Sequence, residues 1–456
     1  MIVSNEDFLI HQAPCTDELK KKILPYRAQE ELLDKWLVKR LDTVLPRVMK
    51  RSGIDCWVVA CKEYNEDPVL ASLTPCAMMT ARRLTILVFH LNEDGEVKRY
   101  ALTRPGVGLD GIYEAVWTNP KGANWGDKDS LMPFGGKEPK ANQAPCETQM
   151  ECLARIIRQC NPSKIGLNTS NTFAFADGLS HNLYTQIMEA LDEDQKAKVV
   201  SADEVCVGWL ETRCEEEMAA YTGIMQIAHT MIAEAFSSKV VIPGVTTNED
   251  VKYWMIQKVI DLGLTPWFDF EVSVRRAHVG EVSGETVIMP GDILHCDVGL
   301  KYLNLCTDTQ ENAYVLKQDE TDVPEELKAV MKTVNRLQDI TISHYKEGRS
   351  GNEILALARA QAIEEGIVPC IYTHPIGFHG HAAGPTIGLW DMQGGVPGQG
   401  DYKMYNDTAY SLELNVKCNV ESWGVTLTFG AETDVLFTGD KTYYIAGRQE
   451  KFHLIK

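Results

Sequence analysis

The sequence predicts two domains, an α/β domain over residues 1–205 and an α+β domain over residues 206–456. Three observations support this prediction. A chain of 456 residues exceeds what one hydrophobic core usually organises. The first half alternates helix and strand patterns, whereas the second half gathers long helices around strands that are paired as hairpins.

In the first half, apolar periodicity separates amphipathic helices from short buried strands. It predicts helices over residues 28–51 and 149–159 and strands over residues 54–60, 83–90 and 164–167. This alternation is typical of an α/β domain.

In the second half, the helices are longer and the strands lie next to one another in the chain. The pattern predicts helices over residues 211–237, 248–262, 324–345 and 351–366, with mainly loop and strand after residue 374. Helices that surround adjacent antiparallel strands favour an α+β domain.

The charge balance limits the partners that the protein can have. The chain has 64 acidic and 45 basic residues, for a net charge of −19. This argues against nucleic acid or an anionic membrane surface, because both require a basic face. No apolar run approaches the length of a membrane span.

Cysteine usage and the N-terminal residues indicate a cytoplasmic protein. The 13 cysteines are odd in number and contain no CxxC pair, which favours a reducing compartment. The first residues lack a basic segment followed by a long apolar core, so they do not form a signal peptide as written.

Two aspartates interrupt the otherwise apolar stretch 293–310. A turn over Lys301–Asn304 would place Asp297 directly opposite Asp308, with their Cβ atoms roughly 5 Å apart. Two ionised carboxylates at that separation repel by about 3 kcal/mol at an effective dielectric constant near 20. A divalent cation between them would remove the conflict.

A second hairpin repeats this arrangement. Strands over residues 410–417 and 425–433, joined by the turn Glu421–Gly424, would place Glu413 opposite Glu432. A single acidic residue in a strand usually faces solvent. Two symmetric carboxylate pairs in apolar strands instead predict a binding site.

Three of the eleven histidines, His374, His379 and His381, lie in the glycine-rich segment 372–388 between the hairpins. Glycines let the backbone approach a ligand closely. Four carboxylates and an imidazole are suited to a pair of Mn²⁺, Co²⁺, Zn²⁺ or Fe²⁺ ions, and they differ from the cysteine ligands of a structural zinc site. Two adjacent ions can activate a shared water molecule, and an activated water molecule is the nucleophile that amide hydrolysis requires.

The motifs around these residues resemble a known family. HCDVG, CTDTQ, GHAAG, SLELN and GAETD follow the Asp, Asp, His, Glu, Glu order of the pita-bread (M24) metallopeptidases, which include methionine aminopeptidase, aminopeptidase P and prolidase. The N-terminal half resembles the creatinase-type domain of the two-domain members. The comparison therefore narrows to the aminopeptidase P, prolidase and creatinase branch.

The resemblance implies roles for these residues. Asp308 and Glu432 would bridge two divalent metal ions, with Mn²⁺ the first expectation. Asp297 would complete one metal site, and His381 and Glu413 would complete the other.

Further roles follow from the same resemblance. Glu413 would also carry the proton, and His278 would face the substrate. Either His374 or His379 would be the remaining site histidine, and spacing does not choose between them. The implied protein is a homodimer that removes the N-terminal residue of a short peptide or cleaves a dipeptide, with the Xaa-Pro bond as a candidate.

Several departures from the family pattern leave proline specificity and the reaction open. Leu-Asn-Val follows Glu413 where the family usually has Pro-Gly, and Thr-Gln-Glu follows Asp308. Phe429-Gly-Ala precedes Glu432 where proline-specific members often carry an arginine. The alternatives are a metal-free creatinase-like amidinohydrolase, a metal-dependent lyase and a non-catalytic peptide-binding protein. The complete ligand set argues against the metal-free and the non-catalytic alternatives.

Overall fold

The computed structural model describes residues 16–21, 23–103, 108–118, 120–121 and 145–456. The chain forms two compact units. The N-terminal unit spans Tyr26–Leu210, and the C-terminal unit spans Glu211–Lys456 together with the described residues up to Pro25. The two units thus divide near the end of helix α7 (Asp203–Glu211), later than the expected boundary at 205–206.

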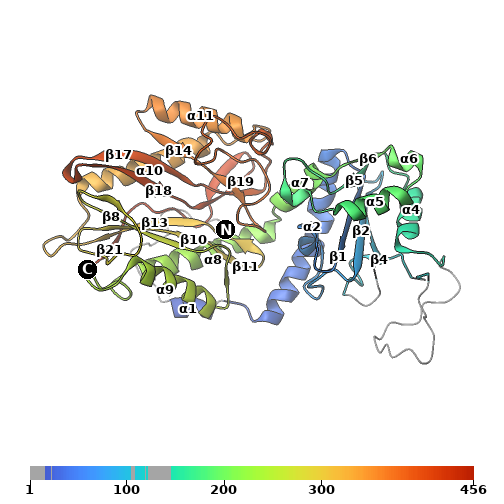
Figure 1. Ribbon diagram of the computed structural model, residues 1–456, viewed down its shortest axis with the longest axis horizontal. Coiled ribbons are helices and arrows are strands. Elements are labelled where there is room, and N and C mark those ends of the chain that lie inside the picture. Colours follow the sequence, from blue (N-terminus) through green and yellow to red (C-terminus); the bar gives the residue numbers. More distant parts are fainter. Residues whose placement is uncertain (1–15, 22, 104–107, 119, 122–144) are drawn as a thin grey trace. The chain divides into compact units, whose positions relative to one another are not determined.

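The N-terminal unit is built on a six-stranded mixed sheet with the strand order β4-β3-β2-β1-β5-β6. Its strands are β1 (Cys56–Lys62), β2 (Leu84–Leu91), β3 (Val97–Leu102), β4 (Glu114–Ala115), β5 (Ile165–Leu167) and β6 (Val199–Ser201). Its helices before α7 are α2 (Tyr26–Ser52), α3 (Leu70–Leu73), α4 (Gln149–Cys160), the 3₁₀ turn η2 (Ala174–Ala176), α5 (His181–Ala190) and α6 (Glu193–Lys196). Alternate β1 side chains pack with apolar residues of α4 and α5. Helices and strands alternate along this unit, which confirms the α/β prediction (Figure 1).

Among the residues that the structure describes, the C-terminal unit contains four long helices and the short helix α1 (Thr16–Lys20). The long helices are α8 (Glu215–Ala235), α9 (Asn248–Asp261), α10 (Glu325–Ser343) and α11 (Gly351–Glu364). The predicted helix 211–237 is wrong at its start, because the chain leaves α7 at Glu211 and begins α8 only at Glu215. The Glu217 carboxylate accepts the Cys214 amide hydrogen (2.9 Å) and so caps the new helix. In the part of the chain that the structure describes, no helix is long and apolar enough to cross a bilayer.

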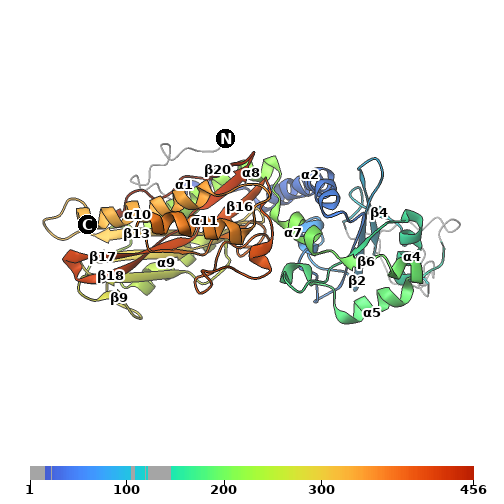
Figure 2. The same ribbon diagram turned by 90° about the horizontal axis from the view of Figure 1, so that it is seen from above.

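Four sheets lie between these helices. Their orders are β21-β13-β10-β8-β9, β12-β11-β7, β14-β17-β18 and β15-β16-β19-β20. Helices α8 and α9 pack against the five-stranded sheet, while α10 and α11 lie side by side over the β14-β17-β18 sheet (Figures 1 and 2). Strands β13 and β18 contact each other, so the two sheets meet inside the unit.

The strands of the C-terminal unit have the following bounds. They are β7 (Thr265–Pro266), β8 (Glu271–Arg276), β9 (Gly280–Val282), β10 (Ile293–Val298), β11 (Leu300–Tyr302), β12 (Leu305–Cys306), β13 (Thr309–Val315), β14 (Pro369–Ile371), β15 (His374–Ile376), β16 (Thr408–Ser411), β17 (Leu414–Val420), β18 (Val425–Ala431), β19 (Asp434–Thr438), β20 (Lys441–Tyr444) and β21 (His453–Ile455). Two 3₁₀ turns, η3 (Gln399–Asp401) and η4 (Glu421–Trp423), complete the unit.

The predicted register of the first hairpin is wrong by two residues. The turn is the tight pair Leu303–Asn304, and both residues have positive φ angles of 51° and 58°. As a result, Asp297 pairs with Gln310 and not with Asp308. Because side chains alternate along a strand, Asp308 still lies on the same face as Gln310 and therefore beside Asp297.

The register predicted for the second hairpin is confirmed. Leu414 pairs with Ala431 and Val420 pairs with Val425, around a turn in which Gly424 adopts φ 64°. Glu413 precedes Leu414 and Glu432 follows Ala431, so both flank the outermost pair of this hairpin. At this point the backbone passes from the β14-β17-β18 sheet to the β15-β16-β19-β20 sheet.

Candidate metal centre

The acidic residues of the candidate centre lie at breaks between strands of the C-terminal unit. Asp308 separates β12 from β13, Glu413 separates β16 from β17, and Glu432 separates β18 from β19. Asp297 lies near the end of β10. A strand break releases a carboxylate from the regular ladder, so these breaks aim side chains from several sheets at one region.

The structure brings together three overlapping sets of possible ligands. In each set the ligand atoms lie within 4.8 Å of one another. The sets are Asp297, Asp308 and Glu432; His374, Glu413 and Glu432; and Asp308, His374 and His381. His374 Nε2 lies 3.5 Å from Asp308 Oδ2 and 3.9 Å from Glu432 Oε1. Because Asp308, Glu432 and His374 each occur in two sets, the arrangement can serve two neighbouring cations.

The predicted histidines occupy four different environments. His374 begins β15 and is buried among the carboxylates. His381 is exposed at the edge of the site, with its ring 4.8 Å from the His374 ring and 5.2 Å from the Trp267 ring, both edge-on. The sequence assigned a ligand role to His381, whereas the set with Glu413 and Glu432 contains His374.

His379 and His278 lie apart from these ligand sets. Burial, together with the positive charges of Lys301 and Arg213, lowers the pKa of His379 to about 4. His278 is exposed in the turn between β8 and β9, where its amide donates to the Trp423 carbonyl oxygen (3.1 Å). Trp423 belongs to the turn of the second hairpin, at the end of that hairpin opposite Glu413 and Glu432.

The carboxylates strongly perturb one another. Burial and then mutual repulsion raise the pKa values of Asp308 and Glu432 well above their usual range. Burial and the charge of Asp297 do the same for Glu413. Burial and the charge of Glu271 raise the pKa of Asp297 to about 7. Without a compensating cation these groups would therefore retain protons near neutral pH.

Unsatisfied polar atoms show that the cluster fits divalent cations. Asp297 Oδ1, Asp308 Oδ1, Glu432 Oε2 and His374 Nε2 are buried and have no hydrogen-bond partner among the described residues. His374 Nδ1 lies 2.9 Å from the Pro375 carbonyl oxygen, which leaves Nε2 as the lone pair facing the carboxylates. Burial, reinforced by the charge of His381, lowers the pKa of His374 to about 4, so its ring is neutral at pH 7. Oxygen-rich donors with one imidazole are suited to Mn²⁺, Co²⁺, Fe²⁺ or Zn²⁺.

Sequence reasoning did not assign three polar residues that touch the cluster. Gln310 donates from Nε2 to Glu413 Oε1 (2.6 Å) and to Asp297 Oδ2 (3.4 Å). Ser411 donates from its hydroxyl to Glu432. Asp434 is buried and accepts the amide hydrogen of Asp308 (3.4 Å). Two signals in the sequence could have identified two of these residues. Gln310 is the unusual residue that follows Asp308-Thr309. Asp434 is an acidic residue two positions after Glu432, on the same face of the strand.

Trp267 forms an aromatic wall beside the cluster. Its indole N–H donates to the Thr307 carbonyl oxygen (2.8 Å), next to Asp308. A Cβ atom at Gly299 would lie 2.1 Å from this ring, and one at Gly380 would lie 2.4 Å from it. These two glycines leave the space for the indole that contacts His381.

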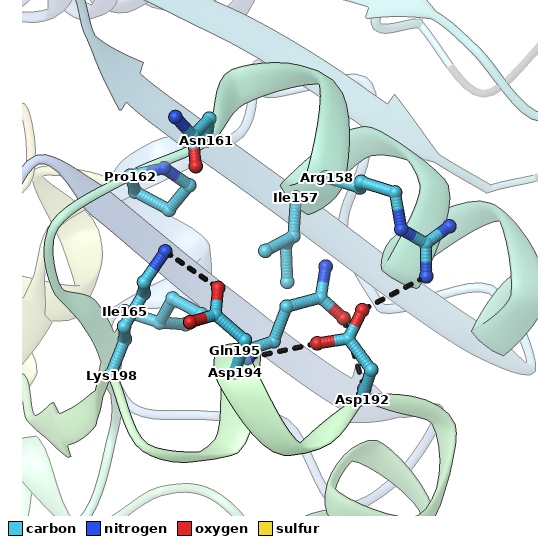
Figure 3. A pocket seen from close by; sticks show the side chains of 9 residues that line it. All are labelled: Ile157, Arg158, Asn161, Pro162, Ile165, Asp192, Asp194, Gln195 and Lys198. Carbon is cyan, nitrogen blue, oxygen red and sulfur yellow. Dashed lines mark hydrogen bonds and ion pairs between the residues drawn. The ribbon is translucent and has the colours of Figure 1, made fainter.

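A surface pocket in the N-terminal unit offers a contrast (Figure 3). Its charged lining residues neutralise each other, with Arg158 paired to Asp192 at 3.1 Å and Lys198 paired to Asp194 at 3.0 Å. The pocket therefore lacks the uncompensated charge that marks the carboxylate cluster.

Comparisons with known proteins identify a family match and a shared fold. Residues 219–431 match the model of metallopeptidase family M24. A search of curated proteins finds no match.

Several solved structures share the fold over most of the chain. An X-Pro aminopeptidase from Thermotoga maritima has a TM-score of 0.57 and 16% sequence identity, covering 90% of this chain and 99% of that chain. An Xaa-Pro dipeptidase from Bacillus anthracis has a TM-score of 0.57 and 17% sequence identity, covering 92% of this chain and 99% of that chain. The prolidase from Pyrococcus furiosus has a TM-score of 0.51 and 15% sequence identity, covering 89% of this chain and 99% of that chain. Residues 219–431 are thus similar to metallopeptidase family M24, and the chain has the two-unit fold of these solved structures, with a pita-bread domain that follows an α/β domain.

Proposed function

We propose that the protein is a metal-dependent peptidase that hydrolyses the amide bond after the N-terminal residue of a short peptide or dipeptide. The observation that carries this proposal is the overlap of the ligand sets at Asp308 and Glu432, together with their unsatisfied buried oxygens. An uncompensated cluster of this kind is stable at neutral pH only with cations or protons bound.

The geometry supports a specific set of ligands. Asp297, Asp308 and Glu432 would hold one ion, and His374, Glu413 and Glu432 would hold the other, with Asp308 also within reach of His374. Asp308 and Glu432 are then the shared ligands. This proposal gives His374 the ligand role that the sequence gave to His381, because His374 is the buried histidine next to Glu432.

The remaining residues would position the reacting groups. A pair of divalent ions, when bound, would polarise the scissile carbonyl group and would lower the pKa of a water molecule so that it ionises near neutral pH. Glu413 would take the proton from the attacking water and pass it to the leaving nitrogen as the C–N bond breaks. Gln310 holds the Glu413 carboxylate in place, and His381, braced by Trp267, would donate a hydrogen bond to the oxygen that becomes negatively charged.

The substrate and assembly form the finer part of the proposal. The similar structures are described as an X-Pro aminopeptidase, an Xaa-Pro dipeptidase and a prolidase, which makes the Xaa-Pro bond the first candidate. Mn²⁺ is the first metal to test. A homodimer is the expected assembly, and light scattering on the purified protein would measure it.

Metal analysis and a substrate panel test the proposal. After reconstitution with Mn²⁺, we expect about two metal equivalents per chain and hydrolysis of at least one member of a panel of Xaa-Pro and non-proline dipeptides and tripeptides. Asp308→Asn should remove metal binding and activity but leave a folded protein. Less than one equivalent of metal, or full activity of the Asp308→Asn variant, would contradict the proposal.

A further inference from the structure

His295 is a buried histidine next to the candidate metal centre, but it does not belong to any of the three ligand sets. It lies on β10, two residues before Asp297, so the two side chains share one face of the strand. Its Nε2 atom lies 3.1 Å from Gln310 Oε1. The imidazole therefore contacts the residue that touches the carboxylates, and not the carboxylates themselves.

The register of β10 and β13 produces this contact. Asp297 is directly opposite Gln310, and His295 is directly opposite Asn312. His295 and Gln310 are thus diagonal neighbours on antiparallel strands, and side chains as long as these can meet across that separation.

The hydrogen atoms of this contact follow from the partners of Gln310. Its Nε2 atom donates to Glu413 Oε1 (2.6 Å) and to Asp297 Oδ2 (3.4 Å). Ionised carboxylates only accept hydrogen bonds, so the NH₂ group must face them and Oε1 must face His295. The imidazole Nε2 atom must then carry the hydrogen, and a directed chain of hydrogen bonds runs from His295 through Gln310 to Glu413.

Gly430 on β18 leaves the space that this chain needs. A Cβ atom at position 430 would lie 2.8 Å from Gln310 Oε1 and 3.0 Å from His295 Nε2. Any other residue there would push the amide and the imidazole apart. The contact between His295 and Gln310 therefore depends on three strands, β10, β13 and β18.

The chain acts unequally on the two proposed metal sites. Glu413 occurs in the ligand set with His374, whereas Asp297 occurs in a set with Asp308. The contact from Gln310 to Glu413 is much shorter than its contact to Asp297, and hydrogen bonds weaken as they lengthen. Loss of the chain should thus affect the site with Glu413 more.

We propose that His295 is a positioning residue, which acts through the Gln310 amide to hold Glu413 as a ligand of one metal ion. This inference rests on the proposed function and assigns a role to a residue outside its ligand sets. Without the His295 N–H group, the buried Oε1 atom of Gln310 would lose its donor, and the amide could rotate away from Glu413. Groups that orient metal ligands in this way typically change metal affinity by about 10–100-fold.

Calorimetric titration of the full-length, metal-free protein with Mn²⁺ tests the inference. Glu413→Gln identifies the binding step of its site, because it removes a ligand charge there. His295→Leu should weaken that step by about 10-fold and the other step by less than about threefold. His295→Gln should restore most of the affinity, since the glutamine amide nitrogen can take the place of the ring Nε2–H group. Gly430→Ala should reproduce the loss although His295 is kept.

His344→Leu is the matched control. His344 Nε2 lies 2.9 Å from Gln361 Oε1, and Gln361 Nε2 donates to Glu365 Oε1 (3.0 Å), so the same three residue types form a chain beside α10 and α11. Glu365 is in none of the ligand sets. This control should leave both Mn²⁺ affinities unchanged.

The outcomes separate a positioning role from a general structural one. Equal weakening of both binding steps in His295→Leu, or no recovery in His295→Gln, would assign His295 to the stability of the fold and overturn the inference. With saturating Mn²⁺, His295→Leu should also lower kcat by about 10-fold and change KM little, because Glu413 is the proposed proton carrier.

The titration contains no peptide, so it also separates this inference from the proposed function. If peptides are hydrolysed and His295→Leu leaves both Mn²⁺ affinities unchanged, only the His295 inference fails. If the Mn²⁺ affinities respond as expected and no peptide is hydrolysed, only the proposed peptidase activity fails.

Discussion

At the scale of single residues, Gln310 decides how the carboxylate of Glu413 is held. Its amide nitrogen contacts Glu413 and Asp297, and its amide oxygen lies 3.1 Å from His295 Nε2. Burial and the Arg275 charge lower the pKa of His295 to about 3, so the ring is neutral at pH 7 and can donate through Nε2–H. This donation fixes the amide orientation, with the NH₂ group toward the carboxylates.

Gln310→Glu should lower kcat by about 10–100-fold, because it places another carboxylate against Glu413 and Asp297 and disturbs the ligands that they provide. Steady-state kinetics with saturating metal would measure the loss. Gln257→Glu is the control, since Gln257 makes the same kind of contact, with Asp261 at 2.8 Å, on the exposed side of α9. Equal kinetics for the two variants would show that Gln310 does not position Glu413.

The histidines show where residue-level prediction from sequence ends. The sequence singled out the segment that contains His374 and His381, because glycines and histidines are concentrated there. It could not say which imidazole turns inward. That depends on His374 pairing with Ser411 across β15 and β16, whereas His381 lies in the loop that follows.

At the scale of elements, turn chemistry explains why one hairpin register was predicted and the other was not. Gly424 is suited to a positive φ angle, so the turn of the second hairpin is readable from the sequence. In the first hairpin a leucine, Leu303, takes a positive φ angle next to Asn304. Leucine rarely adopts that conformation, so the sequence favoured a turn centred one residue too early, which shifts each cross-strand partner by two residues.

Three elements of the C-terminal unit are joined by one buried carboxylate. Glu311 on β13 contacts His229 on α8 and His453 on β21, and all three side chains are buried. Burial alone would raise the pKa of Glu311, but its hydrogen bonds with His229 and His453 outweigh burial and hold the pKa at about 2.

Glu311→Gln should lower the free energy of unfolding by about 3 kcal/mol at pH 7, the value of a pKa depressed from about 4.3 to about 2. A depressed carboxyl pKa stabilises the fold above the unfolded-state pKa, and this contribution is lost as the pH falls through the folded-state pKa. The difference between wild type and variant should therefore stay constant from pH 7 to 5 and shrink below about pH 4. Urea unfolding at several pH values measures it.

Glu365→Gln is the control for this prediction. Glu365 pairs with Arg336 at 2.7 Å on the surface, where water and salt screen the interaction. This variant should change stability far less than Glu311→Gln. Equal effects of the two substitutions would contradict the structural role of Glu311.

At the scale of the whole molecule, the sequence predicted the division into an α/β and an α+β half, because helix and strand periodicity are properties of short segments. The position of the division depends on packing between distant segments. Leu24, for example, precedes the N-terminal unit in the chain but belongs to the C-terminal unit, where its amide donates to the Tyr302 hydroxyl oxygen (2.9 Å). No local pattern reveals such a contact.

The carboxylate cluster makes the stability of the whole protein depend on both metal and pH. For a carboxyl group with a raised folded-state pKa, the stabilisation is present below the unfolded-state pKa and is lost as the pH rises through the folded-state value. For Asp297 this window runs from about pH 4 to about pH 7, and the pKa values of Asp308, Glu413 and Glu432 are raised in the same direction. Chelator-treated protein should therefore show a Tm that falls steadily from pH 5 to pH 8.

Added Mn²⁺ should raise Tm by an increment that grows over the same pH range, because cations bind the deprotonated carboxylates. Differential scanning calorimetry with and without Mn²⁺ measures both trends. Asp308→Asn should flatten the pH dependence of the chelated protein and remove the Mn²⁺ increment, since it removes a charge at the centre of the cluster. A metal-free Tm that is independent of pH from 5 to 8 would show that these carboxylates do not repel one another as the structure implies.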